Sequence, residues 1–194
     1  GLIHTEPTSA ELPSGVITNL QRATIPPSSG GATGTPWFVN GSMPNTTTSG
    51  VSTVESAPWA VTGYAARLTG VSTSTVTNGQ LDFSNAVGAL PATEGEYMAG
   101  RVTVKASKAL DFRVRVRFRT AASGGTTTGD IYGTTISVPA GTPTAVPFVV
   151  LAPASTTVAN VTLMLTGTAN LADGSYFEAA DPIFVTGNTV PAAF

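Results

Sequence analysis

The alternation of apolar and polar residues is clearest between residues 111 and 120. Phe112, Val114, Val116 and Phe118 occupy every second position, and the positions that follow them are all arginine. A β-strand places successive side chains on opposite faces, whereas a helix would spread these arginines around its circumference. The segment is therefore predicted to be a strand with one face on a hydrophobic core.

Other segments with this period, or rich in β-branched and aromatic residues, follow at fairly even intervals. They are residues 61–69, 71–77, 97–106, 131–138, 146–151, 158–167 and 176–185. Turn-forming pairs such as Asn78-Gly79 and Asp173-Gly174 separate them. No segment has the period of a convincing helix. Short, evenly spaced strands are typical of sandwiches and barrels, so we predict an all-β fold that is a sandwich or a barrel.

The start of the chain has a different character. Pro7 and Pro13 disfavour a helix in residues 1–18, and the few apolar residues there are too few to form a core. We predict an extended N-terminal arm at 1–18, docked either on a neighbouring subunit or on its own domain. The remaining residues, 19–194, are assigned to one sandwich domain, since a chain of 194 residues suits a single domain.

The charge and cysteine content of the chain limit the kinds of partner that it could bind. Charged residues make up 10% of the chain and the formal net charge is −2, so we expect neither nucleic-acid nor membrane binding. No apolar run approaches the roughly 18 residues of a membrane span. The chain has no cysteine, which excludes disulfides and thiolate metal sites. Its first residues lack the basic and apolar regions of a secretory signal.

Catalytic chemistry has few candidate residues. The one histidine is His4, in the predicted arm, and the sequence holds no zinc motif and no phosphate-binding glycine loop. A carboxylate pair for glycoside hydrolysis stays open as an alternative. Its candidates all lie near predicted turns: Asp82, Glu94, Glu96, Asp130 and Asp173. We expect a protein that is not an enzyme and that uses no cofactor.

Aromatic residues are the first candidates for ligand binding, because the apolar face of a sugar stacks on an aromatic ring. Trp59 lies in a loop-like Ala57-Pro58-Trp59 context, and Tyr64 and Tyr97 lie at the starts of predicted strands. Packing in the core or between subunits is the alternative for each of them. The same alternative applies to Trp37, Tyr132 and Tyr176.

The arginine positions of the 111–120 strand are the second candidates. Arg113, Arg115, Arg117 and Arg119 would lie about 7 Å apart on one face and repel one another. They require carboxylates, solvent or an anionic partner. Salt bridges, a subunit interface and an anionic ligand such as a cell-wall glycopolymer all remain open.

Several short pieces occur in an order that resembles the jelly-roll domains of tail and fibre proteins in actinobacterial phages. The resemblance spans residues 18–194 and includes Thr18-Asn19-Leu20, the Arg-Val-Arg-Val-Arg strand and the aromatic end at 191–194. Its other pieces are TGTPW at 33–37, AGRVTVKAS at 99–107, SVPAGT at 137–142, VVLAPA at 149–154 and GSYFEAADPIFV at 174–185. Those phage domains are similar to carbohydrate-binding modules, and the resemblance implies an all-β, two-sheet antiparallel β-sandwich of the jelly-roll type.

The resemblance implies a non-enzymatic structural protein of a bacteriophage particle, in the tail, a fibre or a capsid decoration. Its partners would be other virion subunits, in a homo-oligomer such as a trimer on the outside of the virion, and a bacterial surface glycan. The alternative is a carbohydrate-binding module that attaches to bacterial cell-surface polysaccharide. A secreted bacterial adhesion module is a third, less favoured alternative.

A structural calcium ion is a further implication of this resemblance. Some carbohydrate-binding modules hold one partly through an acidic residue of the last strand, and Asp181 occupies that place here. The Asn-Pro-Ser and Glu pattern common near the start of the family is absent, since residues 21–26 read QRATIP. This departure argues against the calcium site.

Overall fold

The computed structural model describes residues 51–70, 79–84, 89–166, 171 and 174–192. The predicted arm at 1–18, the segment 19–50 and the predicted strand at 71–77 lie outside these residues. Within them the chain forms strands and turns and no helix, so the described part holds no helix that could cross a membrane.

Eleven strands are defined among these residues. Their bounds are β1 Val51–Ser56, β2 Tyr64–Thr69, β3 Gln80–Asp82, β4 Leu90–Pro91, β5 Tyr97–Ala106, β6 Leu110–Arg119, β7 Thr127–Tyr132, β8 Ile136–Val138, β9 Thr144–Leu151, β10 Val158–Leu165 and β11 Tyr176–Thr186.

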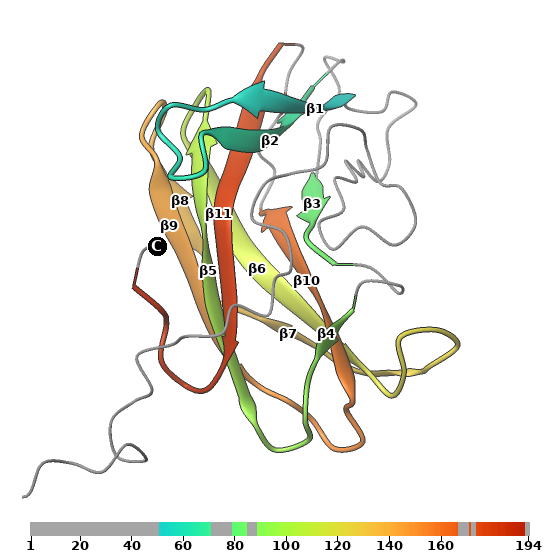
Figure 1. Ribbon diagram of the computed structural model, residues 1–194. Helices are drawn as coiled ribbons and strands as arrows, with labels where there is room; N and C mark the ends of the chain where they lie inside the picture. The colour runs from blue at the N-terminus through green and yellow to red at the C-terminus, as the bar shows by residue number, and fades with distance from the viewer. Residues whose placement is uncertain (1–50, 71–78, 85–88, 167–170, 172–173, 193–194) are drawn as a thin grey trace, which may run out of the picture.

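The strands form two antiparallel sheets packed face to face (Figure 1). Sheet I has the order β1-β2-β11-β5-β9, and sheet II has the order β3-β10-β6-β7, with β4 also pairing with β10 and β8 with β6. The last long strand, β11, lies between β2 and β5, so segments far apart in sequence are neighbours in sheet I. This arrangement confirms the predicted two-sheet jelly-roll sandwich.

The core lies between the sheets and contains the apolar positions of β6. Phe112, Val114, Val116 and Phe118 are fully buried there, as their alternation predicts. Phe112 meets Phe177 of β11 edge to face, with ring centroids 5.0 Å apart. This contact joins the two sheets, because such aromatic pairs stabilise packing beyond their buried area.

Gly100 of β5 allows close packing at the end of the core that lies away from Phe112 and Phe177. A Cβ atom at Gly100 would lie 2.6 Å from the carbonyl oxygen of Ile183 and from the ring of Phe184, and 2.8 Å from the ring of Phe148. These distances are shorter than any real Cβ contact. Two phenylalanine rings therefore pack over β5 only because position 100 has no side chain.

The predicted strands differ from the structure in two respects. The predicted strand at 131–138 is divided into β7 and β8, which follow one another along the same edge of β6. Gly133 still donates a backbone hydrogen bond to Val114 of β6, and a Cβ atom at this position would lie 2.8 Å from Phe148 of β9. The second difference is that β1, β3 and β4 have no counterpart among the predicted strands.

Candidate functional site

The outward side of sheet II carries most of the polar side chains that could bind a ligand. We call this surface, formed by β3, β10, β6 and β7, the arginine face. It holds an open groove of about 350 Å³, within the range of small-ligand sites. The groove is lined by Gln80, Asp82, Ser84, Arg115, Arg117, Arg119, Thr127, Asn160 and Thr162.

Strand register places these residues in rows across the sheet. Thr162 of β10 lies opposite Asp82 of β3 on one side and opposite Arg115 of β6 on the other. The same row ends at Tyr132 of β7, which pairs with Arg115. Because residues opposite one another in an antiparallel sheet point to the same face, one row presents a carboxylate, a hydroxyl, a guanidinium and a phenol.

The row is ordered by two hydrogen bonds. The Thr162 hydroxyl donates to Asp82 Oδ1 at 2.7 Å and accepts from an Nη of Arg115 at 3.2 Å. Burial raises the pKa of Asp82 above its usual value of 3.8, against the opposing effects of the Thr162 hydrogen bond and the nearby positive charges of Arg115 and Arg117.

Arg117 is neutralised by a neighbouring carboxylate. Its Nε and Nη2 atoms donate to the two oxygens of Asp130, on β7, at 2.8 and 2.7 Å. This two-pronged hydrogen bond lowers the pKa of Asp130 and raises the pKa of Arg117. It confirms one of the roles expected for the arginines, a salt bridge, for this residue.

The other arginines are held by neutral groups. Arg119 donates to the carbonyl oxygen of Gly125 at 2.6 Å, and the guanidinium of Arg113 lies 4.0 Å from the centre of the Tyr132 ring. Among the described residues, no hydrogen-bond partner is found for the buried Nε atoms of Arg113, Arg115 and Arg119 or for Oδ1 of Asn160. The face thus combines ordered side chains with unpaired polar atoms.

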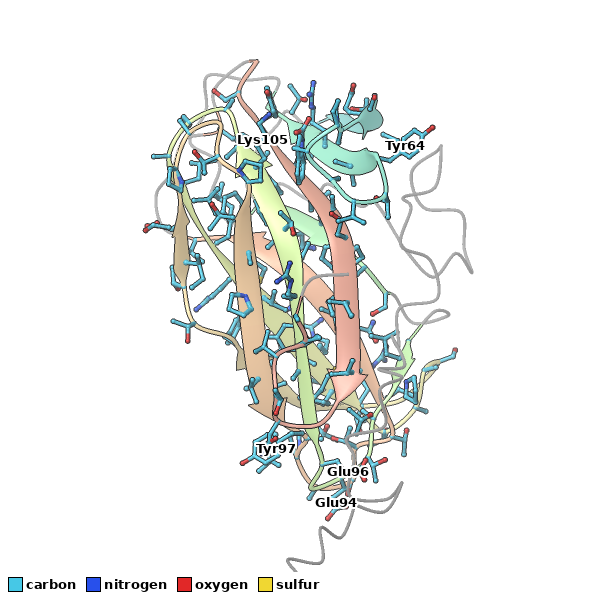
Figure 2. All side chains as sticks on the ribbon, turned by 60° about the vertical axis from the view of Figure 1, so that its left-hand side comes forward. Tyr64, Glu94, Glu96, Tyr97 and Lys105 are labelled. Atoms are coloured by element: carbon cyan, nitrogen blue, oxygen red, sulfur yellow. The ribbon has the colours of Figure 1, made fainter. Side chains whose placement is uncertain are left out.

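None of the three aromatic residues predicted to bind a ligand lies on this face, and Tyr64 and Tyr97 do not lie close together. Tyr64 begins β2 and Tyr97 begins β5, and Figure 2 shows them at opposite ends of the sandwich. Both are largely exposed, at 47% and 44%. Of the predicted site residues, the structure brings together only Arg113, Arg115 and Arg117.

Trp59 belongs to a structural cluster on the outside of sheet I. Its ring packs against small buried side chains that include Ala65 and Ala180, and its Nε1 donates to Glu178 at 3.1 Å. Glu178 also accepts from Arg67, whose guanidinium lies over the ring of Tyr176. Trp59 is therefore only partly exposed, and its polar atom is already bonded.

Asp181 secures a turn. Its carboxylate accepts from the backbone N–H groups of Val61 and Thr62 at 2.8 and 3.1 Å, and from the Thr62 hydroxyl at 3.0 Å. It lies at an irregularity of β11 and has a φ of 51°. No group of three or more acidic or histidine residues that could hold a metal occurs in the described part of the chain. The observed hydrogen bonds assign Asp181 to the turn between β1 and β2.

The carboxylates considered for glycoside hydrolysis lie in separate regions, and Glu94 and Glu96 lie together in the turn between β4 and β5 (Figure 2). Asp82 and Asp130 lie on the arginine face but on strands separated by β10 and β6, so their backbones are roughly 14 Å apart at the usual strand spacing. Hydrolytic pairs lie closer, at about 5–9.5 Å. Glu94 accepts a hydrogen bond from the backbone of Ser155, and Asp173 lies outside the described residues.

Most of the groove was not found from the sequence. Asp82 was considered only as a catalytic candidate, and Asn160 and Thr162 were not considered as site residues. The alternation of β10 places Asn160 and Thr162 on the face opposite to Val161 and Leu163. It indicates a shared site with the arginines only once β10 is known to pair with β6.

Comparisons with known proteins support the fold assignment. No protein-family model matches the sequence, and no curated protein matches it. A carbohydrate-binding module of family CBM4 superimposes with a TM-score of 0.52 at 13% identity, covering 77% of this chain and 86% of that one. The CBM22-1 xylan-binding domain of Paenibacillus barcinonensis Xyn10C gives 0.52 at 13% identity, covering 84% and 91%.

A phage protein has a similar domain. The enzymatically active domain of tailspike protein 4 from bacteriophage CBA120 matches with a TM-score of 0.52 at 11% identity. The match covers 78% of this chain but only 19% of the tailspike chain. At these identities the comparisons establish a shared fold: the chain contains a β-sandwich jelly roll like those of carbohydrate-binding modules.

The Arg117–Asp130 pair predicts a pH-dependent contribution to stability. Because the pKa of Asp130 is lowered on folding, its charged form stabilises the protein above the usual pKa of 3.8, and this contribution is lost as the pH falls through the folded-state value. Asp130→Asn should lower the free energy of unfolding at pH 7 by less than about 1 kcal/mol. Urea unfolding at pH 7 and at about pH 2.5 should show that difference shrinking; a constant difference would contradict the assignment. Glu96→Gln controls for loss of an exposed charge.

The Asp181 contacts predict a larger effect. Asp181→Ala leaves the N–H groups of Val61 and Thr62 without an acceptor and should lower the free energy of unfolding by about 2 kcal/mol. Asp181→Asn keeps one oxygen and should cost less. Thermal unfolding of the wild type should be the same in EDTA and in CaCl₂, because donors already occupy both oxygens. A melting temperature raised by calcium and lost in Asp181→Asn would favour a metal site instead.

Proposed function

We propose that this chain is a non-catalytic glycan-binding domain whose binding surface is the arginine face. The observation that carries the proposal is the groove on this face, in which guanidinium, hydroxyl, amide and carboxylate side chains line one open surface. A ligand with many hydroxyl groups would form hydrogen bonds with these side chains, because a hydroxyl both donates and accepts.

The chemistry of the groove suits a sugar. The groove offers guanidinium donors on β6 beside the carboxylate of Asp82 and the side-chain amide of Asn160, and a sugar hydroxyl can donate to or accept from such groups. Pyranose stacking has a smaller part, since Tyr132 is the one described aromatic residue on this face and its ring already lies against Arg113. We infer recognition mainly through hydrogen bonds.

The sheet gives this surface a fixed geometry. The groove residues are carried by β3, β10 and β6, and by the start of β7, while the opposite side of these strands is buried in the core. A ligand would therefore meet groups that are already in place, which reduces the entropy lost on binding. The likeness of the fold to carbohydrate-binding modules supports the same proposal.

Asn160→Ala tests this proposal because it removes a polar side chain from the groove lining, and that side chain's oxygen has no hydrogen-bond partner among the described residues. We expect unchanged or slightly higher thermal stability and about tenfold weaker glycan binding, the equivalent of one good hydrogen bond. Affinity gel electrophoresis through a panel of neutral and acidic polysaccharides would measure it.

Tyr64→Ala and Tyr97→Ala are the matched controls, since both side chains are exposed away from the arginine face. They should bind as the wild type does. Absence of retardation by every polysaccharide, or weaker binding in these two variants but not in Asn160→Ala, would refute the proposal.

A second candidate function, compatible with the first, is that of a virion component that associates with copies of itself or with other subunits on the exterior of a phage particle. The similar fold within a phage tailspike supports it. So do three exposed apolar residues on the outside of sheet I: Tyr97 of β5, and Val149 and Leu151 of β9. In the described sheet β9 is the last strand, a position at which chains often pair.

Light scattering coupled to size exclusion tests this second function. We expect a mass that is a small multiple of 19.6 kDa, such as that of a trimer. Leu151→Lys, which places a charge in the apolar strip, should reduce that mass, whereas Thr103→Lys on the polar part of the same sheet should not. A monomeric wild-type protein at micromolar concentration would count against self-association.

A further inference from the structure

The arginine face carries more positive charge than the structure neutralises. Among the described residues it holds four of the nine basic residues of the chain, Arg113, Arg115, Arg117 and Arg119, together with the three carboxylates of Asp82, Asp111 and Asp130. These residues give the face a net charge of +1 in a chain whose net charge is −2. Positive charge is concentrated on one side of one sheet.

Only one of these arginines forms an ion pair in the described part of the chain. Arg117 donates two hydrogen bonds to the carboxylate of Asp130. In the described part of the chain Arg113, Arg115 and Arg119 form no salt bridge. Their contacts are a phenol ring, a threonine hydroxyl and a backbone carbonyl, respectively. Neutral contacts orient these three groups without cancelling their charge.

The arrangement is regular. Arg113, Arg115 and Arg119 are on the same side of β6, and adjacent positions of that side repeat at about 7 Å. A guanidinium offers a planar pair of N–H donors that matches carboxylate, sulfate or phosphate oxygens. The side chains are partly buried, so a charge-assisted bond here is less screened by water than it would be on an open surface.

We propose that the ligand of the arginine face is an acidic polysaccharide, whose anionic groups pair with Arg113, Arg115 and Arg119 while its hydroxyls bond to Asn160 and Asp82. This inference rests on the proposed glycan-binding function and specifies its ligand class. A nucleic acid fits less well, because the described residues of the face include a single tyrosine and no series of rings on which bases would stack.

The test uses pairs of polymers that differ only in charge. Polygalacturonate is compared with its fully methyl-esterified form, and dextran sulfate with dextran, by affinity electrophoresis and calorimetry. We expect the acidic member of at least one pair to bind at least ten times more tightly than its neutral partner. Binding should weaken as NaCl is raised from about 0.05 to about 0.5 M, because salt screens the charges.

Single substitutions test whether acidic polymers bind at the arginine face. Arg115→Gln and Arg113→Gln should each weaken acidic-polymer binding about tenfold or more, and Arg115→Lys should give an intermediate loss because it keeps the charge but not the planar donor pair. Lys105→Gln, on the outward side of β5 in sheet I, makes the same change in net charge away from the groove and should bind as the wild type does. Circular dichroism checks that each variant is folded.

Each alternative outcome has a distinct meaning. Equal binding of the acidic and neutral members would overturn the acidic ligand and leave the glycan proposal standing. No binding to any polymer would overturn both. An equal loss in Lys105→Gln would show that net charge, and not this face, is responsible. Tighter binding of a single-stranded oligonucleotide than of any acidic polysaccharide would assign the face to nucleic acid.

Discussion

The structure depends on the two-sided burial of strand β6. An extended strand must place its odd and even side chains on opposite faces, and here the apolar set is buried between the sheets while every outward position from 113 to 119 is an arginine. Any shift of register by one residue would drive four guanidinium groups into the core, at a prohibitive cost in desolvation. The register of β6 with β10 and β7 is therefore strongly constrained, and with it the composition of the whole outward face.

That constraint has a consequence for the charges. Four arginines in a row would repel one another, yet each is held by a different group: a ring, a hydroxyl, a carboxylate and a carbonyl oxygen. Only one of these is an anion. The arginine side chains are thus held in place without being neutralised. A row of solvent-exposed charges is usually less ordered, and this arrangement suits the binding of an anionic ligand.

The acidic residues elsewhere serve the fold. Asp181 holds the β1–β2 turn, Glu94 bonds to the turn before β10, and Glu178 joins Trp59 to Arg67 on sheet I. These contacts give structural roles to Asp181, the residue considered for metal binding, and to Glu94, one of the residues considered for hydrolysis. They also explain why Trp59, which looks like an exposed loop residue, is part of a hydrogen-bonded cluster.

The sequence by itself determined the fold class, because the alternation of apolar and polar residues is a local property of an extended chain. It can be recognised without knowing which strands lie beside it. It identified β6, the burial of Phe112 through Phe118 and the row of outward arginines. It did not indicate β1, β3 or β4, and it joined β7 to β8, which residues 133–135 separate. Only the tertiary structure decided which strands lie beside β6, and so which residues complete the groove. Asp82, Asn160 and Thr162 are brought to the arginines by pairings between segments distant in sequence, and such pairings depend on the packing of the whole core, which no local pattern encodes.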